Sequence, residues 1–128
     1  MKIAFAYTGI RVRSLPESVE FYTKGSGMKV VGESAIEQTG GRVVNLVSED
    51  GGFPLELNHY GSSSKYNTEY AIGEGLDHLA FGTGDLKGLL ERANGLGYPV
   101  TADLRTDSSR WVYIYDPNGI WIELFQAP

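Results

Sequence analysis

An internal repeat constrains the fold of this chain more than any other feature of its sequence. Tyr7 and His78 lie 71 residues apart (78 − 7), and Leu15 and Leu86, which open two helical stretches, have the same separation (86 − 15). Each copy reads as a strand, a helix and three further strands. Such a repeat builds its core from two similar supersecondary units, so we expect an α+β protein of two tandem βαβββ modules.

Each copy also carries a glutamate inside an apolar, strand-like run. Glu56 lies in Pro54–His59 and Glu123 lies in Trp121–Gln126, and the two are 67 residues apart (123 − 56), so the second copy is a few residues shorter. An unpaired carboxylate is costly to bury. Two acids at corresponding positions of a repeat therefore indicate a ligand that binds carboxylates, and a divalent metal ion is the first candidate.

Capping residues and apolar spacing locate the two helices. Ser14 is the expected N-cap of the first helix, with Glu17 completing a capping box, and a glycine cluster at 25–27 ends it. Asp85 caps the second helix, which closes at Gly97. Residue alternation and turn residues predict strands at 2–12, 28–32, 42–47, 54–60, 76–83, 99–104, 109–115 and 119–126.

Length and composition fit one globular domain over residues 1–128, with module 1 at about 1–60, a linking loop at about 61–75 and module 2 at about 76–128. The net charge of −5, with scattered basic residues, argues against nucleic acid as a partner. No apolar run approaches the roughly 18 residues of a membrane span, so we expect no membrane partner. The absence of cysteine fits a reducing, cytoplasmic location.

Strand parity predicts which side chains share a face of each sheet. Alternate positions of the last strand are aliphatic and should pack against helices: Ile120, Ile122 and Leu124. Glu123 then points into a space lined by Trp121 and Phe125. The same alternation groups His78 with Ala80 and Gly82, Glu56 with Asn58 and Tyr60, and Tyr7 with Phe5, Gly9 and Arg11. The small residues beside His78 should leave room above the sheet.

The candidate ligands are unremarkable one by one, because a histidine in a strand is usually a surface residue and a glutamate between leucines usually faces solvent. Their coincidence is informative. Glu56, His78 and Glu123 occupy repeat-equivalent positions, and the fourth position holds Tyr7. Imidazole and carboxylate together suit zinc, nickel, cobalt, iron or manganese better than a thiolate-preferring ion.

The duplicated pattern resembles the vicinal oxygen chelate superfamily, which includes glyoxalase I, extradiol dioxygenases and bleomycin-binding proteins. The resemblance covers essentially the whole chain. Its motifs are Ile10–Val12, Ser18–Tyr22, Gly27–Met28, Leu55–Leu57, Leu76–Phe81, Asp116–Gly119 and Ile122–Leu124. It implies half-open, curved mixed sheets with helices outside, and a homodimer with shared active sites.

Within the superfamily the chain is most similar to glyoxalase I, whose metal ligands are typically His or Gln, then Glu, His and Glu. The resemblance implies Glu56, His78 and Glu123 as ligands and places Tyr7, a departure, in the first position. Arg11 matches a position that helps hold the carboxylate of glutathione, whereas Tyr60 replaces a glutathione-contacting asparagine. Trp121 and Tyr113 complete the expected substrate-binding residues.

The implied reaction is that of a lyase acting on the hemithioacetal of a 2-oxoaldehyde and a thiol such as glutathione, by proton transfer through an enediolate. Glu123 would move the proton, and Glu56 would serve the opposite face of the substrate. Two alternatives remain open. One is an epimerase-like enzyme acting on an acyl thioester. The other is a non-catalytic drug- or metabolite-binding protein of the bleomycin-resistance type, with a pocket lined by Trp111, Tyr113, Trp121 and Phe125.

Overall fold

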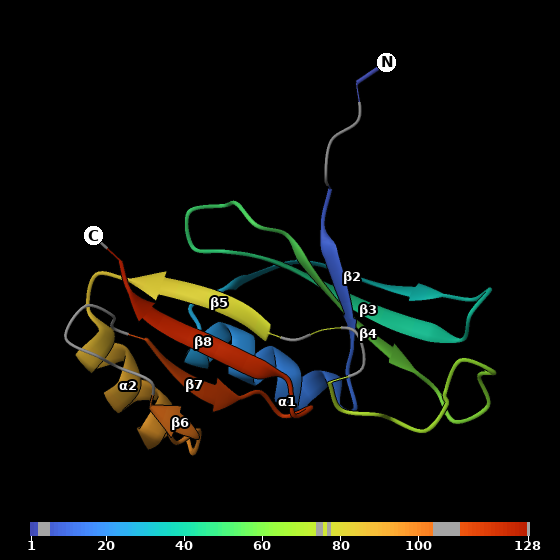
Figure 1. Cartoon of the computed structure of the whole chain (residues 1–128). Helices are drawn as coiled ribbons and strands as arrows, with labels where there is room; N and C mark the ends of the chain where they lie inside the picture. Colours follow the sequence, from blue (N-terminus) through green and yellow to red (C-terminus); the bar gives the residue numbers. More distant parts are fainter. Residues whose placement is uncertain (3–5, 74–75, 77, 104–110, 128) are drawn as a thin grey trace. The chain divides into compact units, whose positions relative to one another are not determined.

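The computed structural model describes residues 1–2, 6–73, 76, 78–103 and 111–127 (Figure 1). The chain divides into two compact units, Met1–Tyr70 and Ala71–Pro128. Residues 61–70 of the expected linking loop therefore belong to the first unit.

Each unit contains one four-stranded mixed sheet, and the two sheets have the same topology. The first has the order β1-β4-β3-β2, and the second the order β5-β8-β7-β6. In each, the first strand pairs in parallel with the last, and the other pairs are antiparallel. The strands are β1 (Thr8–Arg11), β2 (Lys29–Ile36), β3 (Gly41–Val47), β4 (Leu55–Tyr60), β5 (His78–Thr83), β6 (Ala102–Asp103), β7 (Trp111–Tyr115) and β8 (Trp121–Gln126). The prediction of two tandem βαβββ modules with open sheets is confirmed.

Strand register shows the repeat residue by residue. Gly9 of β1 lies beside Glu56 of β4, and Ala80 of β5 lies beside Glu123 of β8. Both pairs keep the separations seen in the sequence, 71 for the first strands (80 − 9) and 67 for the last strands (123 − 56). The two glutamates therefore occupy equivalent places in equivalent sheets.

The register also locates the shortening of the second copy. Asn45 faces Glu56 across the β3–β4 pair, and Tyr113 faces Glu123 across the β7–β8 pair. Their separation is 68 (113 − 45). Of the four residues lost between the first and last strands (71 − 67), three are thus lost before the third strand and one in the final hairpin.

The first helix, α1 (Leu15–Glu20), begins as its sequence predicts. The Ser14 hydroxyl accepts a hydrogen bond from the backbone N–H of Glu17 at 3.3 Å. Pro16 lies in the first turn, where its missing N–H has no intrahelical partner to lose.

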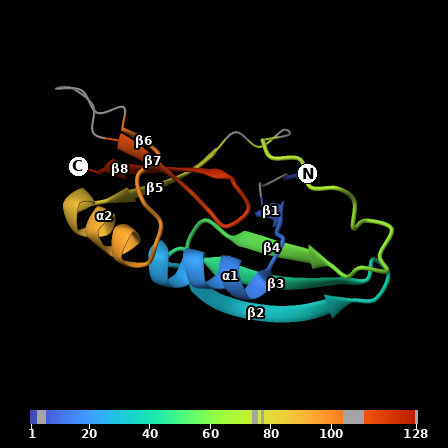
Figure 2. The ribbon, with the colours of Figure 1, turned by 90° about the horizontal axis from the view of Figure 1, so that it is seen from below.

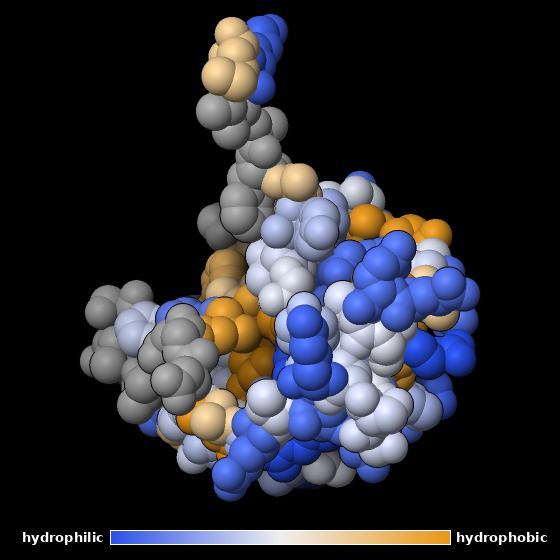
Figure 3. Space-filling view, turned by 90° about the vertical axis from the view of Figure 1, so that its right-hand side faces the viewer, coloured by the Kyte–Doolittle hydropathy of each residue, from blue (hydrophilic) through white to orange (hydrophobic). Residues whose placement is uncertain are grey.

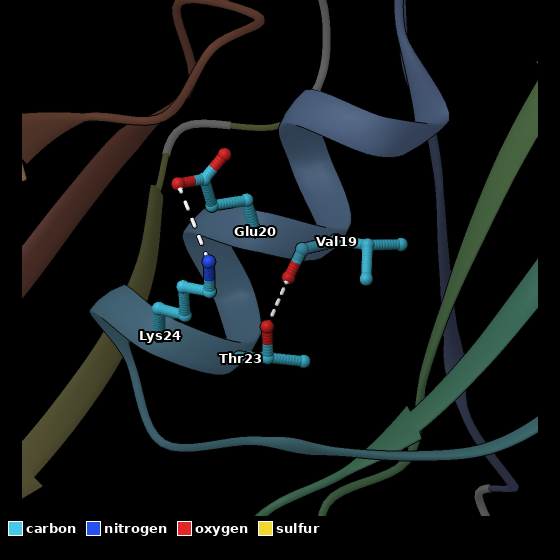
Figure 4. Close-up of polar contacts among 4 residues, drawn as sticks. All are labelled: Val19, Glu20, Thr23 and Lys24. Carbon is cyan, nitrogen blue, oxygen red and sulfur yellow. Dashed lines mark hydrogen bonds and ion pairs between the residues drawn. The ribbon is translucent and has the colours of Figure 1, made fainter.

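The helix continues into a π-helical turn, η1 (Phe21–Gly25). The Thr23 hydroxyl donates to the carbonyl oxygen of Val19 at 2.6 Å, and the Lys24 ammonium lies 3.9 Å from the Glu20 carboxylate (Figure 4). A hydroxyl bonded to the carbonyl four residues earlier competes with the backbone and often bends a helix. The helix then ends at the predicted glycine cluster.

The second helix, α2 (Leu86–Gly95), is capped at both ends. The Asp85 carboxylate accepts from the backbone N–H of Gly88 at 3.0 Å. At the other end, Gly97 has φ +88°, and the backbone N–H of Tyr98 donates to the carbonyl of Ala93 at 2.8 Å. This is a Schellman motif, which requires a residue that tolerates positive φ, and glycine does so without strain.

The core of each unit lies between its sheet and its helix, and α2 lies alongside the second sheet (Figure 2). The largest fully buried side chains are Phe21, Tyr22, Leu46 and Leu57 in the first unit and Val112, Ile122 and Leu124 in the second. Ile120, Ile122 and Leu124 are all buried, as strand parity predicts. On the face in Figure 3 the exposed hydrophobic side chains form patches among hydrophilic ones. None of the helices in the described ranges is both long and apolar enough to cross a bilayer.

Several predicted strand boundaries were wrong. The first strand begins at Thr8 instead of residue 2; residues 3–5 lie outside the described ranges. Its pairing starts where β4 starts, because Pro54 precedes β4 and has no N–H to donate to a ladder. The second strand extends to Ile36, four residues past its predicted end (36 − 32), because its pairing with β3 continues up to Gly41.

Candidate active site

Two of the predicted ligands come together in the second unit. The Nε2 atom of His78 on β5 lies 3.3 Å from the Oε2 atom of Glu123 on the neighbouring strand β8. The side chains are 36% and 23% exposed, so a ligand can reach both. The imidazole ring also meets the ring of Tyr113 edge to face, at 5.9 Å between centroids.

This pair has the donor chemistry and the spacing of two ligands of one metal ion. Two atoms that each lie about 2.1 Å from an ion are roughly 3.0–3.4 Å apart in octahedral or tetrahedral coordination. The separation of 3.3 Å between His78 Nε2 and Glu123 Oε2 falls in this range. Within the described ranges, however, no three His, Cys, Asp or Glu side chains form a metal-binding group by themselves. The pair therefore amounts to half of the predicted ligand set.

Aromatic side chains surround this pair on the same face of the sheet. Strand pairing makes three rows: His78, Trp121 and Tyr115; Ala80, Glu123 and Tyr113; Gly82, Phe125 and Trp111. The ring of Trp121 makes edge-to-face contacts with Tyr113 at 4.9 Å and Tyr115 at 5.2 Å. Glu123 thus lies in the central row of a largely aromatic surface, as its strand parity predicts.

The room expected above β5 is smaller than predicted. A Cβ atom at Gly82 would lie 2.6 Å from the Cζ atom of Phe125, so the ring of Phe125 occupies the space over this glycine. Sequence reasoning recognised that Gly82 leaves space but could not show which side chain fills it.

Glu56 lies in the first unit, on β4, between Gly9 of β1 and Asn45 of β3. The side-chain amide of Asn58 donates to its Oε1 atom at 3.0 Å. Within the described ranges, no hydrogen bond engages its Oε2 atom. The carboxylate is therefore oriented by a neighbour on its own strand, with one oxygen left to meet a ligand.

Tyr7 precedes β1 and is 53% exposed. Its repeat counterpart, His78, is the first residue of β5 and pairs with Trp121. The position that corresponds to Trp121 in the first unit is held by Pro54 (121 − 67 = 54), and β1 pairing starts only at Thr8. Tyr7 is thus less firmly placed than the histidine it corresponds to.

Arg11 is engaged by the segment that follows β4. Its guanidinium donates to the Thr68 hydroxyl at 3.1 Å, to the carbonyl oxygen of Thr68, and to the Asn67 side chain at 3.4 Å. It also lies 5.7 Å from the centroid of the Tyr70 ring. Sequence reasoning missed this arrangement. The only signal for it was the polar composition of the loop, which does not identify a partner.

Tyr60 is the last residue of β4, on the same sheet face as Glu56 by strand alternation. Its ring lies 5.6 Å from that of Tyr66, and the Lys65 ammonium lies 5.1 Å from the Tyr66 ring. Among the predicted site residues, the second unit brings together His78, Glu123, Tyr113 and Trp121, whereas Glu56, Tyr7, Arg11 and Tyr60 lie in the first unit.

Known proteins resemble the chain in sequence and in structure. A lactoylglutathione lyase of Arabidopsis thaliana is 32% identical over 95% of this chain and 44% of its own length. A lactoylglutathione lyase of Pseudomonas aeruginosa is 27% identical over 96% of this chain and 82% of its own length. The structure of the trypanothione-dependent glyoxalase I of Leishmania major matches with a TM-score of 0.76 and 28% identity, over 98% of this chain and 87% of that one.

The chain spans less than half the length of the plant relative. Residues 4–124, nearly the full length of the sequence, match the model of the Glyoxalase/Bleomycin resistance protein/Dioxygenase superfamily. The duplicated βαβββ topology, the equivalent glutamates and this match agree: the chain belongs to the Glyoxalase/Bleomycin resistance protein/Dioxygenase superfamily.

Proposed function

We propose that the protein is a glyoxalase I-like, metal-dependent lyase that isomerises the hemithioacetal of a 2-oxoaldehyde and a thiol. The observation that carries the proposal is the contact of 3.3 Å between His78 Nε2 and Glu123 Oε2 on an accessible face of the second sheet. The equivalent place in the first sheet holds Glu56. Relatives named lactoylglutathione lyase support the same reaction class.

In this proposal Glu56, His78 and Glu123 hold a divalent metal, with Tyr7 in the fourth position. Nickel, zinc, cobalt, iron and manganese all fit a donor set of imidazole and carboxylate. When bound, such an ion supplies positive charge next to the substrate oxygens, which favours loss of a proton from the adjacent carbon.

The carboxylates then move the proton. Glu123 Oε2 removes the carbon-bound hydrogen as a proton and returns it to the neighbouring carbon, so no atom is lost or gained. Glu56 serves the opposite face of the substrate, and the amide of Asn58 fixes the direction of its carboxylate. Trp121 and Tyr113 limit the access of water to the reacting carbon and contact the apolar part of the substrate.

Arg11 is the candidate partner for a carboxylate of the thiol. Because its guanidinium already donates to Thr68 and Asn67, an anionic thiol has to share or replace these acceptors. A neutral thiol has no carboxylate to place on Arg11 and leaves these hydrogen bonds intact. We therefore propose that the identity of the thiol is where this protein departs most from glyoxalase I. Glutathione is one candidate among several thiols.

A complete site in this proposal needs both units, because Glu56 lies in the first and His78 and Glu123 lie in the second. We propose a homodimer in which first and second units combine into shared active sites, since closed two-fold dimers are the commonest assemblies of soluble proteins.

The test is an assay of methylglyoxal with several thiols, run together with elemental analysis of the purified protein. Glu123→Gln should lower kcat by roughly 10²–10⁴-fold, the usual contribution of a positioned acid or base. Full isomerase activity in this variant would refute the assignment.

The aromatic surface of the second sheet favours a second candidate, a non-catalytic binder of an apolar or cationic small molecule. Tyr113, Trp121 and Tyr115 already form a chain of edge-to-face contacts at 4.9 and 5.2 Å. Metal content separates the two functions: a stoichiometric divalent ion supports the lyase. A protein that contains none and gains no activity on reconstitution supports the binder.

A further inference from the structure

The first unit contains a cavity that none of the residues discussed above explains. Its volume is about 560 Å³. It lies between the start of α1 and strands β2, β3 and β4, and its lining residues are Arg13, Ser14, Leu15, Pro16, Val19, Glu33, Arg42, Val43, Val44 and His59.

The cavity opens on the face of the sheet opposite to Glu56. His59 lies between Asn58 and Tyr60 on β4, and successive side chains of a strand point to opposite faces, so His59 points away from the face of Glu56. Arg42 faces His59 directly across the β3–β4 pair and shares its face. The cavity is therefore separate from the proposed active site.

The polar part of the lining is predominantly basic, although the chain has a net charge of −5. Arg13 and Arg42 carry positive charge, His59 adds an imidazole, and Glu33 is the one acid in the lining. Tyr70, which is not part of the lining, orients Arg13. The guanidinium of Arg13 lies 4.5 Å from the centroid of the Tyr70 ring, a cation–π distance.

Arg42 and His59 have donors to offer. Within the described ranges, no hydrogen bond or ion pair engages the side chain of either residue. Facing side chains on an antiparallel pair have Cβ atoms about 4.5–5.5 Å apart, so both can reach one bound group. An anion between these two side chains can accept hydrogen bonds from both, and the charge of Arg42 strengthens the bond that it donates.

We propose that this cavity binds a small organic anion, with its phosphate or carboxylate on Arg42, Arg13 and His59. The remaining lining is apolar, from Leu15, Pro16, Val19, Val43 and Val44, and fits an apolar body attached to the anionic group. The volume lies within the roughly 300–1,000 Å³ of small-molecule sites. The arginine guanidinium pairs with either oxyanion through two parallel hydrogen bonds.

The test is a titration of the full-length protein followed by backbone and arginine Nε NMR signals and by calorimetry. Phenyl phosphate and benzoate are the two anionic probes, and benzyl alcohol is the neutral probe of similar size. We expect saturable shifts at Arg42, His59 and residues 13–19 with at least one anion and none with benzyl alcohol. Comparison of the two anions distinguishes phosphate from carboxylate as the preferred group.

Two substitutions in the cavity should act in opposite directions. Arg42→Gln should weaken binding of the preferred anion roughly five-fold or more, and Glu33→Gln should strengthen it about two- to five-fold, since it removes the only opposing charge. Arg92→Gln, at an exposed position of α2 in the second unit, makes the same charge change as Arg42→Gln and should leave binding unchanged.

Three outcomes would overturn the proposal. They are no saturable shift with either anion, equal shifts with benzyl alcohol, and equal weakening by Arg92→Gln and Arg42→Gln. The site does not depend on the proposed lyase activity. Binding measured by these signals succeeds or fails independently of the methylglyoxal assay.

Discussion

The first sheet has Arg11 beside Asn58 at the place where the second sheet has Gly82 beside Phe125. The adjoining acids follow the same contrast. Glu56 accepts a hydrogen bond from the side-chain amide of Asn58, whereas Glu123, which pairs with Tyr113, contacts the imidazole of His78. The topology and the glutamates are duplicated, but the neighbours have diverged. The first sheet has polar groups at these positions, and the second has aromatic side chains around the contact between His78 and Glu123.

The largest expected effect comes from removing the two acids in separate chains. Glu56→Gln and Glu123→Gln should each lower kcat by about 100-fold or more. If active sites are shared between chains, unfolding and refolding an equal mixture of the two variants should restore roughly one quarter of wild-type activity, because half of the dimers then have one intact site. A mixture as inactive as its components would show that each site is built within one chain. Gel filtration with light scattering checks the assembly.

Repeat-equivalent leucines test whether the halves fold together. Leu57 and Leu124 (124 − 67 = 57) are both almost fully buried, and replacement of either by alanine should lower the free energy of unfolding by roughly 2–5 kcal/mol. Urea denaturation followed by NMR signals of each half is the measurement. We expect every signal to lose stability in both variants, which is the behaviour of one domain. Loss confined to the mutated half would show two independently stable domains.

The last hairpin of each half contains an aspartate, and we expect its removal to lower the free energy of unfolding by different amounts in the two halves. Asp116 is buried, and its Oδ1 atom accepts from the backbone N–H groups of Asn118 and Ile120, both at 2.8 Å. Asp116→Ala should therefore cost about 1–3 kcal/mol, because it leaves buried donors unpaired. Asp50, in the other hairpin, is exposed, and Asp50→Ala should lower stability much less than Asp116→Ala does. Thermal denaturation of both variants checks the contrast, and equal costs would contradict it.

The difference between Tyr7 and His78 can be removed by mutation. Tyr7→His gives the first half the ligand type of the second, and it should raise the affinity for zinc or nickel roughly ten-fold, since imidazole is a better ligand than a neutral phenol. Competition with a chromogenic chelator measures the change. Tyr66→His is the matched control, at another exposed tyrosine of the first unit. An equal gain in both variants would mean that position 7 is not part of the site.

The smallest effect concerns Asp50. The Ser48 hydroxyl and the backbone N–H of Gly52 donate to its carboxylate and hold the pKa of Asp50 below its ordinary value of 3.8. A lowered pKa contributes stability that is present above the ordinary value and is lost as the pH falls through the lowered value. Ser48→Ala should therefore raise the pKa of Asp50 toward 3.8 and reduce this acid dependence. Carboxyl carbon NMR shifts between about pH 2 and 5 measure it. An unchanged pKa would contradict the assigned cause.

The fold could be predicted because its signals are local. Caps at Ser14 and Asp85 and the alternation of Ile120, Ile122 and Leu124 depend on neighbours within a few residues. The shared face of His78 and Glu123 followed from strand parity and the repeat. Strand ends were less predictable, because they depend on the partner strand, as at Pro54.

Long-range contacts were beyond the reach of sequence patterns. The hydrogen bonds of Arg11 to Thr68 span 57 residues, and the facing of Arg42 and His59 depends on the register of a hairpin. Neither has a periodicity or a motif that a single sequence can reveal. The proposal that Glu56 joins His78 and Glu123 rests on the repeat and on the family likeness.

The ring of Phe125 over Gly82 makes these two positions interdependent during evolution. Because a Cβ atom at position 82 would lie 2.6 Å from the Cζ atom of Phe125, a substitution there requires the ring to move or position 125 to become smaller. Homologous chains should therefore show covariation between these positions, with a larger residue on one strand accompanied by a smaller one on the other. Gly82→Ala alone should lower the free energy of unfolding. Adding Phe125→Ala in the same chain should remove the part of this loss that comes from overlap with the ring.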